Sequence, residues 1–214
     1  YRAEADVNRQ HLKMDDLVFG FPKGRTVIVC DIDGTVSMTH YQELVLDARD
    51  DMWSKAFPDS ADVLRELSKR YGLVYLTARP GFLLEKTKRW LATNGFPQAP
   101  VVTTPGLVQS IGVESFKSKR IMHFQMLFGT VGIGIGNADT DSEAYAMNDL
   151  LPLLIDDRDG KQFRAHAVVL RNWRSVRAFF DANQAVLENP DRLKKAVKGE
   201  EMILRPIVRY QKPE

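Results

Sequence analysis

The chain has 214 residues, of which 44% are hydrophobic and 27% are charged, as in an ordinary globular protein. Its formal net charge of +2 is too small to indicate nucleic acid or an anionic membrane as a partner by charge alone. The single cysteine, Cys30, excludes an internal disulfide and a zinc site made of cysteines. The sequence contains no apolar run of about eighteen residues, so it predicts no transmembrane helix.

Segments typical of strands and helices alternate from residue 26 onward. The apolar, β-branched run at 26–30 predicts a strand that is buried on both faces. Pro58 and Asp59 open a predicted helix that ends at Gly72. Further strands are predicted at 73–76, 101–102, 131–135, 153–155 and 168–170, and further helices at 83–95, at 115–128, just before 153, and from the cap at Asn172 to 187.

This alternation predicts an α/β fold with three layers, a Rossmann-like core and a mainly parallel sheet. Polar clusters at 31–35, 77–79 and 136–141 each follow a predicted strand. Ligands of such sheets bind beyond the carboxyl ends of the strands, so we expect the three clusters to meet at one edge.

We divide the chain by composition into three parts. Residues 1–24 are expected to form an N-terminal arm, and residues 25–189 to form the α/β domain. Residues 190–214 are rich in charge and are expected to be a tail with less order.

The carboxylates in these clusters predict a metal site. Asp31 and Asp33 are two residues apart after a buried strand, and crowded carboxylates repel unless a cation or a proton intervenes. Asn137, Asp139 and Asp141 offer further oxygens, and ligands that are all oxygen favour a hard cation such as Mg²⁺. One such cluster alone would be equally typical of a solvated turn. Two clusters after apolar strands favour the metal site.

The same clusters resemble the signatures of the haloacid dehalogenase superfamily. Residues 31–35 read Asp-Ile-Asp-Gly-Thr, which resembles the first signature, and Thr77 resembles the second. A lysine before the fourth strand resembles the third, and residues 136–141 resemble the fourth in its Gly-Asn-x-x-x-Asp form. All four stand in the order of the family, and the resemblance covers roughly residues 25–170.

The resemblance implies a Mg²⁺-dependent phosphatase that acts on phosphomonoesters. Asp31 would attack phosphorus and become an aspartyl-phosphate. Asp33 would protonate the leaving oxygen and then accept a proton from the water that hydrolyses the intermediate. Mg²⁺ would be held by Asp31, the main-chain carbonyl of Asp33 and Asp141, with Asn137 close by. Thr77 and a lysine would hold the phosphoryl oxygens.

Two lysines fit the third signature. We prefer Lys117 as the catalytic lysine because the pair Phe116-Lys117 resembles a Phe-Lys pair of one subfamily, and we keep Lys119 as a substrate-binding candidate. For either lysine, the alternative is a solvated helix face. Thr35, Arg79 and Asn137 are further substrate-binding candidates, and the alternative for Arg79 is a structural ion pair.

A closer resemblance is to the LNS2 domain of lipin phosphatidate phosphatases and of the larger phosphatidylinositol transfer proteins. It is based on residues 31–35, 75–80 (Tyr-Leu-Thr-Ala-Arg-Pro), 104–107 and 136–145. Thr77 stands where that family has Ser, and Asp139 also departs from its pattern. The resemblance implies phosphatidic acid at a membrane surface as the substrate.

The segment 36–57 stands where members of the superfamily insert a cap domain. About twenty residues are too few for a cap that folds independently, so we expect a minimal cap or none, and an open site for a large substrate. His40, Tyr41, Trp53 and Phe57 could touch that substrate, although packing on the sheet is favoured for Trp53 and Phe57.

Three functions fit the sequence: a Mg²⁺-dependent phosphatase, a phosphatidic-acid-binding module without turnover, and a phosphatase for a soluble or polynucleotide phosphate. Net charge and the lack of an interleaved aromatic and basic surface argue against nucleic acid. Basic groups at 86–89 and 171–177 could face an anionic membrane, but interspersed acids favour a solvated surface. We favour a soluble, cytoplasmic or peripheral membrane protein, and leave the oligomeric state open.

Overall fold

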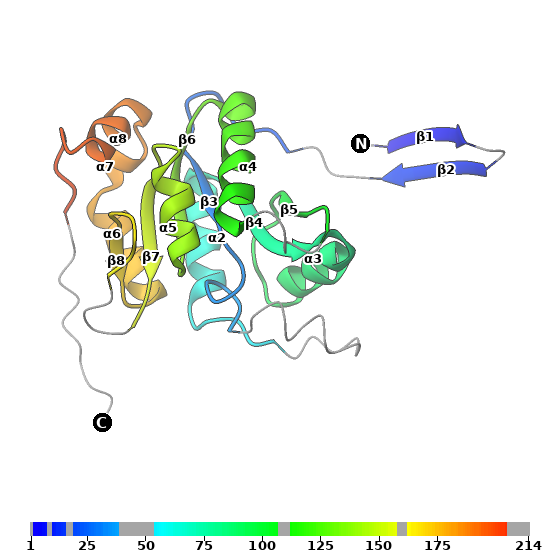
Figure 1. The fold of residues 1–214 in the computed structure, drawn as a ribbon, viewed down its shortest axis with the longest axis horizontal. Helices are drawn as coiled ribbons and strands as arrows, with labels where there is room; N and C mark the ends of the chain where they lie inside the picture. The colour runs from blue at the N-terminus through cyan, green and yellow to red at the C-terminus, as the bar shows by residue number, and fades with distance from the viewer. Residues whose placement is uncertain are drawn as a thin grey trace.

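A computed structural model describes the backbone of residues 2–7 and 10–15 and the full structure of 19–38, 54–106, 112–157 and 162–204. Its centre is a six-stranded sheet in the order β5-β4-β3-β6-β7-β8, with every neighbouring pair parallel (Figure 1). A two-stranded sheet of β1 and β2 is separate from it. The structure therefore confirms the predicted α/β architecture.

The strands at the middle of the large sheet are its most apolar segments. β3 (Val27–Cys30) is completely buried and pairs with both β4 (Gly72–Pro80) and β6 (Val131–Gly136). A strand with neighbours on both sides and helices on both faces needs apolar side chains in both directions, which explains its continuous run. The remaining strands are β5 (Val101–Thr104), β7 (Leu151–Ile155) and β8 (Val168–Leu170).

Helices cover both faces of the sheet and complete three layers (Figure 1). One core cluster joins the sheet to α2 (Ser60–Arg70), α3 (Leu84–Thr93) and α6 (Trp173–Ala182). The other joins it to α4 (Val113–Phe128) and α5 (Asp139–Ala146). The short helices are η1 (Gly81–Leu83), α7 (Gln184–Leu187) and α8 (Pro190–Val197).

Strand β4 is longer than the apolar run at 73–76 predicts. β4 continues to Pro80, so Thr77 and Arg79 lie inside the strand and not after it. Both are almost completely buried, and they make polar contacts that substitute for apolar packing. The strand predicted from apolar residues ended at residue 76 and was therefore too short.

The start of the predicted tail belongs to the fold. Residues 190–197 form α8, and the Asn189 side chain caps it by accepting from the backbone N–H of Asp191 and Arg192. Leu193 is 2% exposed and lies against Gly132 of β6. One apolar residue per turn is enough to dock a charged helix. The expectation of a less ordered tail is therefore corrected for residues 190–197, which form a helix. Residues 205–214 lie outside the described part.

The N-terminal arm contains a hairpin that the sequence analysis did not predict. β1 (Arg2–Val7) pairs with β2 (Gln10–Asp15) in an antiparallel register, with Ala3 opposite Met14 and Ala5 opposite Leu12. Residues two apart on a strand share a face, so this register brings apolar positions together. The alternation of apolar and charged residues at 2–7 was the signal available.

The region expected to hold a minimal cap is described at its two ends only. Phe57 is half-buried and packs against the core, as favoured from the sequence. His40, Tyr41 and Trp53 lie outside the described residues. Within the described ranges, no helix is both long enough and apolar enough to cross a bilayer.

Candidate active site

The polar clusters meet at the carboxyl edge of the sheet. Asp31 follows β3, and its backbone N–H donates to the carbonyl of Ile135 in β6, which aligns the two strand ends. The α4 helix begins near this edge and brings Lys117 to Asp31. The turn after β6 contributes Asn137, and β4 contributes Thr77 and Arg79, so the site is built from segments far apart in the sequence.

Lys117 lies between two buried carboxylates. Its Nζ is 2.6 Å from Asp31 Oδ1 and 2.5 Å from Asp141 Oδ1, and all three side chains are at most 6% exposed. One ammonium against two carboxylates leaves an excess negative charge if both acids are ionised. Burial raises the pKa of Asp31 to about 7, with Lys117 opposing this rise and Asp141 and Asp33 adding to it.

Lys117 itself stays protonated. Burial acts to lower its pKa, but Asp141 and Asp31 outweigh that effect and raise the pKa above its ordinary value. A permanent cation beside Asp31 suits the binding of an anionic phosphoryl group.

Asp141 braces the turn between β6 and α5. Its Oδ2 accepts hydrogen bonds from the backbone N–H of Asn137 at 3.0 Å and of Ala138 at 3.1 Å. A Cβ at Gly136 would lie 2.5 Å from this carboxylate, so the close approach requires glycine. Both oxygens of Asp141 are therefore engaged, one with the turn and one with Lys117. Its predicted role as a metal ligand stays a prediction.

Asp33 is held by Arg79 and Thr77. The guanidinium of Arg79 donates to it through Nε at 3.1 Å and through Nη2 at 2.8 Å, and the Thr77 hydroxyl donates to Asp33 Oδ2 at 2.9 Å. The Arg79 side chain is 3% exposed, and the Asp33 side chain is 11% exposed. This is the ion pair considered from the sequence as the alternative for Arg79, and it fixes the orientation of the Asp33 carboxylate.

Oxygen atoms gather around the hydroxyl of Thr35. This hydroxyl lies 3.1 Å from Asp31 Oδ2 and 3.1 Å from Asn137 Oδ1. A Cβ at Gly34, which has φ +75°, would collide with the Asn137 side chain, so glycine lets the two segments approach. No group of three or more His, Cys, Asp or Glu suited to a metal occurs in the described ranges. The oxygen donors and the excess negative charge nevertheless fit Mg²⁺, which binds through few carboxylates and keeps several waters.

The two candidate lysines differ in position. Lys117 is buried among the carboxylates, whereas Lys119 is exposed on the outer side of α4. The geometry thus favours Lys117 as the lysine of the site.

Two residues around the site were missed by the sequence analysis. Thr87 of α3 accepts from Arg79 Nη1 at 3.1 Å, and the Trp173 indole N–H donates to the Thr35 carbonyl at 2.9 Å. Thr87 is a polar residue on an otherwise apolar helix face, which was a usable signal. Trp173 is distant in sequence, and nothing local indicated its contact.

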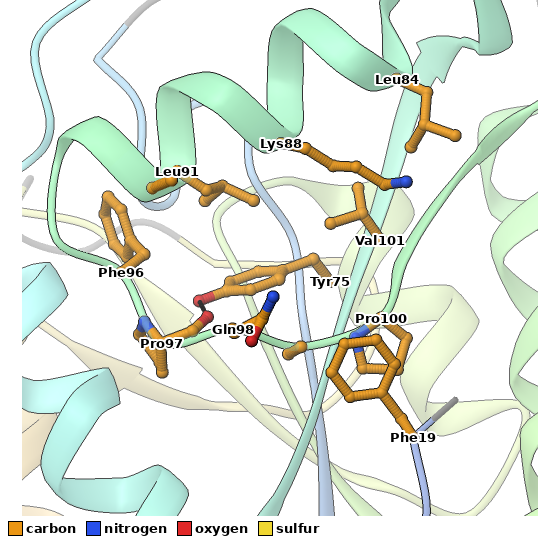
Figure 2. A pocket seen from close by; sticks show the side chains of 12 residues that line it. Phe19, Tyr75, Leu84, Lys88, Leu91, Phe96, Pro97, Gln98, Pro100 and Val101 are labelled. Carbon is orange, nitrogen blue, oxygen red and sulfur yellow. Dashed lines mark hydrogen bonds between the residues drawn. The ribbon is translucent and has the colours of Figure 1, made fainter. Parts of the chain in front are cut away.

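One pocket borders the site, and a second pocket lies away from the site carboxylates. One of about 600 Å³ borders the site at Gly34 and Asn137 and extends to Arg171 and Trp173. The other, of about 380 Å³, lies between α3, β5 and the loop that joins them, with Phe19 opposite (Figure 2). The second is mainly apolar and does not include the site carboxylates.

Comparison with family models shows the family of the chain, and comparison with solved structures shows its fold. A family model described as the LNS2 domain of PITM 1-3 matches residues 28–153. No curated protein matches the chain in sequence.

Solved structures with this fold share little sequence with the chain. D,D-heptose 1,7-bisphosphate phosphatase from B. bronchiseptica, in complex with magnesium and phosphate, is 17% identical with a TM-score of 0.52, over 72% of this chain and 96% of its own. A candidate HAD-like phosphatase from Mesorhizobium loti is 13% identical with a TM-score of 0.54, over 86% and 92%. A haloacid dehalogenase-like hydrolase from Streptococcus pneumoniae is 15% identical with a TM-score of 0.51, over 73% and 99%.

Proposed function

The chain belongs to the LNS2 domain family of PITM 1-3, and we propose that it is a Mg²⁺-dependent phosphomonoester hydrolase that works through an aspartyl-phosphate on Asp31. The observation that carries the proposal is the buried contact of Asp31 with Lys117 at the carboxyl edge of the sheet. A carboxylate beside a fixed cation can accept a phosphoryl group as a covalent nucleophile, while the cation offsets the charge of the phosphate.

The first step joins a carboxylate oxygen of Asp31 to phosphorus and breaks the bond from phosphorus to the alcohol oxygen. Asp33 donates a proton to the departing alkoxide. In the second step water attacks the aspartyl-phosphate, Asp33 accepts its proton, and phosphate and the Asp31 carboxylate are released. Lys117 stabilises the charge on the phosphoryl oxygens throughout.

Arg79 and Thr77 act on this chemistry through Asp33. Their hydrogen bonds hold the Asp33 carboxylate in one orientation, so this side chain is preorganised before the substrate binds. We assign the two residues as positioning groups for Asp33. The Thr35 hydroxyl contacts Asp31 and helps to orient it, and Asn137 contacts the same hydroxyl and supplies a further oxygen.

Mg²⁺ would be held by Asp31, the main-chain carbonyl of Asp33 and Asp141, with Asn137 close by. When bound, this ion would neutralise phosphate charge and allow one anion to approach another.

The test is phosphate release from dispersed phosphatidic acid and from a soluble phosphomonoester, with Mg²⁺ or with chelator. We expect release that requires Mg²⁺ and falls by at least about a thousandfold in Asp31→Asn, because the nucleophile is lost. An unchanged rate in Asp31→Asn would reject the mechanism. Release from the soluble ester alone would keep the phosphatase and reject the lipid substrate.

A binding module without turnover is the second candidate, and the clamp on Asp33 favours it. Both oxygens of Asp33 already accept hydrogen bonds from Arg79 or Thr77, so one of these contacts would have to open before Asp33 could serve a leaving group. Binding of phosphatidic acid vesicles without phosphate release in Mg²⁺ would support this candidate.

A further inference from the structure

The outer face of α4 is largely apolar, whereas that of α2 is charged. The exposed residues of α4 are Lys119, Met122, His123, Met126 and Leu127. The exposed residues of α2 are Asp62, Arg65, Glu66 and Lys69. The inner face of α4 already packs on the sheet through Ile121 and Phe124, so the core does not require the outer methionines. A helix that is apolar on both faces is typical of one that is covered on both sides.

Met147 continues this apolar face onto the C-terminus of α5, which lies beside α4 (Figure 1). The Asn148 side chain donates to Ser118 Oγ at 2.8 Å, and the Gln125 side chain donates to the Asn148 carbonyl at 2.7 Å. Ser118 and Gln125 stand four residues before and three residues after Met122, so the chain at 147–148 lies beside Met122. We call this surface the Met face; its members are each at least 55% exposed, and they are Met122, Met126, Leu127 and Met147.

The polar residues along the α4 part of the Met face are basic. Lys119 and His123 stand in one stripe with Met122 and Met126, because residues three and four apart share a side of a helix. The one acid in the sequence of α4 is Glu114, which is eight residues before Met122, about 12 Å along the helix. The stripe therefore combines apolar side chains with positive charge.

The acids nearest in sequence to the α5 end of the Met face have basic neighbours. Glu143 lies 3.6 Å from Arg164. Asp149 borders a pocket of about 330 Å³ together with Lys194 and Lys198, and the C-terminal end of α4 also lines this pocket. The border of the Met face is thus basic at both ends of α4.

An acidic amphipathic helix fits this surface. Apolar side chains along two packed helices can take the apolar side of a third helix, and methionine side chains adapt to the shape of a partner. We propose that the Met face docks an acidic amphipathic helix of another protein, with the carboxylates of that helix beside Lys119 and His123. Met126 lies nine residues beyond Lys117, about 13 Å along α4, so a docked helix leaves the Asp31 site free.

Two other occupants fit the Met face less well. A second copy of this chain, docked about a two-fold axis, would bring Lys119 and His123 against the same cations of the copy. Interfacial insertion into a bilayer typically uses Trp, Phe and Leu, whereas three of the four residues of the Met face are methionine.

The probe is a synthetic peptide of about 18 residues, labelled with fluorescein, with Leu at every third or fourth position and Glu between. A second peptide has Lys in place of Glu. We expect fluorescence anisotropy to show that the acidic peptide binds the full chain at least about tenfold more tightly than the basic peptide does. No binding of the acidic peptide at about 100 µM protein, or equal binding of the two peptides, would overturn the proposal.

Substitutions on the Met face test where the peptide binds. Met126→Asp should weaken binding of the acidic peptide by at least about tenfold, because it places a negative charge within the apolar contact. Lys119→Glu should weaken it by about fivefold, because the charge beside the peptide is reversed. Met202→Asp is the matched control and should bind as the wild type does, because Met202 is 79% exposed and lies outside the Met face. Equal affinity of wild type and Met126→Asp would overturn the proposal. Urea unfolding curves show whether each variant is folded.

A label at position 126 tests the contact directly. Cys30 is the single cysteine and is completely buried, so Met126→Cys can be labelled selectively with bimane. An acidic peptide that carries Trp in its apolar stripe should quench this label and leave a label at Met202→Cys unchanged. Quenching at 202 alone, or at neither position, would overturn the proposal.

Sedimentation of the protein, alone and with vesicles of phosphatidylcholine and phosphatidic acid, tests the other occupants. A dimer that Met126→Asp dissociates would assign the Met face to a second copy and overturn the proposal. Vesicle binding that Met126→Asp abolishes, with no binding of the acidic peptide, would assign it to a bilayer and do the same. Phosphate release from a soluble ester should be equal in Met126→Asp and wild type, so the docking surface and the proposed hydrolysis are tested separately.

Discussion

Lys117 and Lys119 are two residues apart on α4, yet only Lys117 reaches the carboxylates. Lys117→Ala should lower the turnover rate by at least about a hundredfold, because it removes the cation expected to offset charge on the phosphoryl group. Lys119→Ala should keep a rate close to that of the wild type, because this side chain is exposed. Steady-state hydrolysis of a soluble phosphomonoester measures both variants. Equal losses in the two would contradict the assignment.

Asp31 is expected to cost stability in its ionised form. Its folded-state pKa of about 7 lies above its ordinary value of 3.8, so the folded protein retains a proton that the unfolded chain releases. The stability of the metal-free protein should therefore fall as pH rises from about 4 to about 7, and this contribution should then level off.

Asp31→Asn removes this cost while Lys117 keeps Asp141 as a partner. We expect its free energy of unfolding to exceed that of the wild type by on the order of 1 kcal/mol at pH 8, and by less at pH 5. Urea unfolding in the presence of chelator measures the difference. A difference that is constant with pH, or larger at pH 5, would contradict the argument.

Asp31 as the proposed nucleophile, the lysine and Thr35 were all predicted from local motifs. The partners of these residues could not be derived in the same way. The Asp33 clamp joins residues 44 to 46 positions apart, and the Trp173 contact spans 138 positions. Such contacts depend on how strands and helices pack, which a motif does not encode.

At the level of secondary structure elements, α8 shows how few apolar side chains dock a charged helix. Leu193→Ala should lower the free energy of unfolding by about 2–3 kcal/mol, because Leu193 is 2% exposed and packs on Gly132. Met202→Ala is the matched control; Met202 is 79% exposed and its loss should change stability by less than about 0.5 kcal/mol. Urea unfolding measures both. Equal effects would show that α8 does not contribute to the core.

The predicted elements were most accurate where the apolar pattern was strong, as in the continuous run at 26–30 and on the apolar face of the helix predicted between Asp59 and Gly72. They failed where polar contacts or sparse apolar residues decide the structure. β4 continues through Thr77 and Arg79 because Asp33 satisfies their side chains, and α8 docks through Leu193 and Val197 alone among its apolar side chains that contact the core cluster. A few polar residues at the end of a strand, or a few apolar residues in a charged segment, occur too often by chance in a short stretch of sequence to predict these elements.

At the scale of the whole molecule, the sheet concentrates charge at one edge. Asp31, Asp141 and Lys117 leave an excess negative charge there when both acids are ionised, and the buried position raises the electrostatic cost. A cation that binds only the folded protein stabilises it in proportion to the logarithm of its concentration. The fold and the proposed metal site are therefore coupled.

Mg²⁺ at about one hundred times its dissociation constant should add about 2.7 kcal/mol of stability and raise the unfolding temperature of the wild type by about 5–10 °C. Asp31→Asn should lose most of this rise, because the excess charge and a carboxylate ligand are removed. Asp62→Asn should retain it, because the Asp62 side chain is 72% exposed on α2. Thermal unfolding with Mg²⁺ and with chelator measures all three proteins. An equal rise in wild type and Asp31→Asn would place the ion elsewhere, away from the proposed nucleophile.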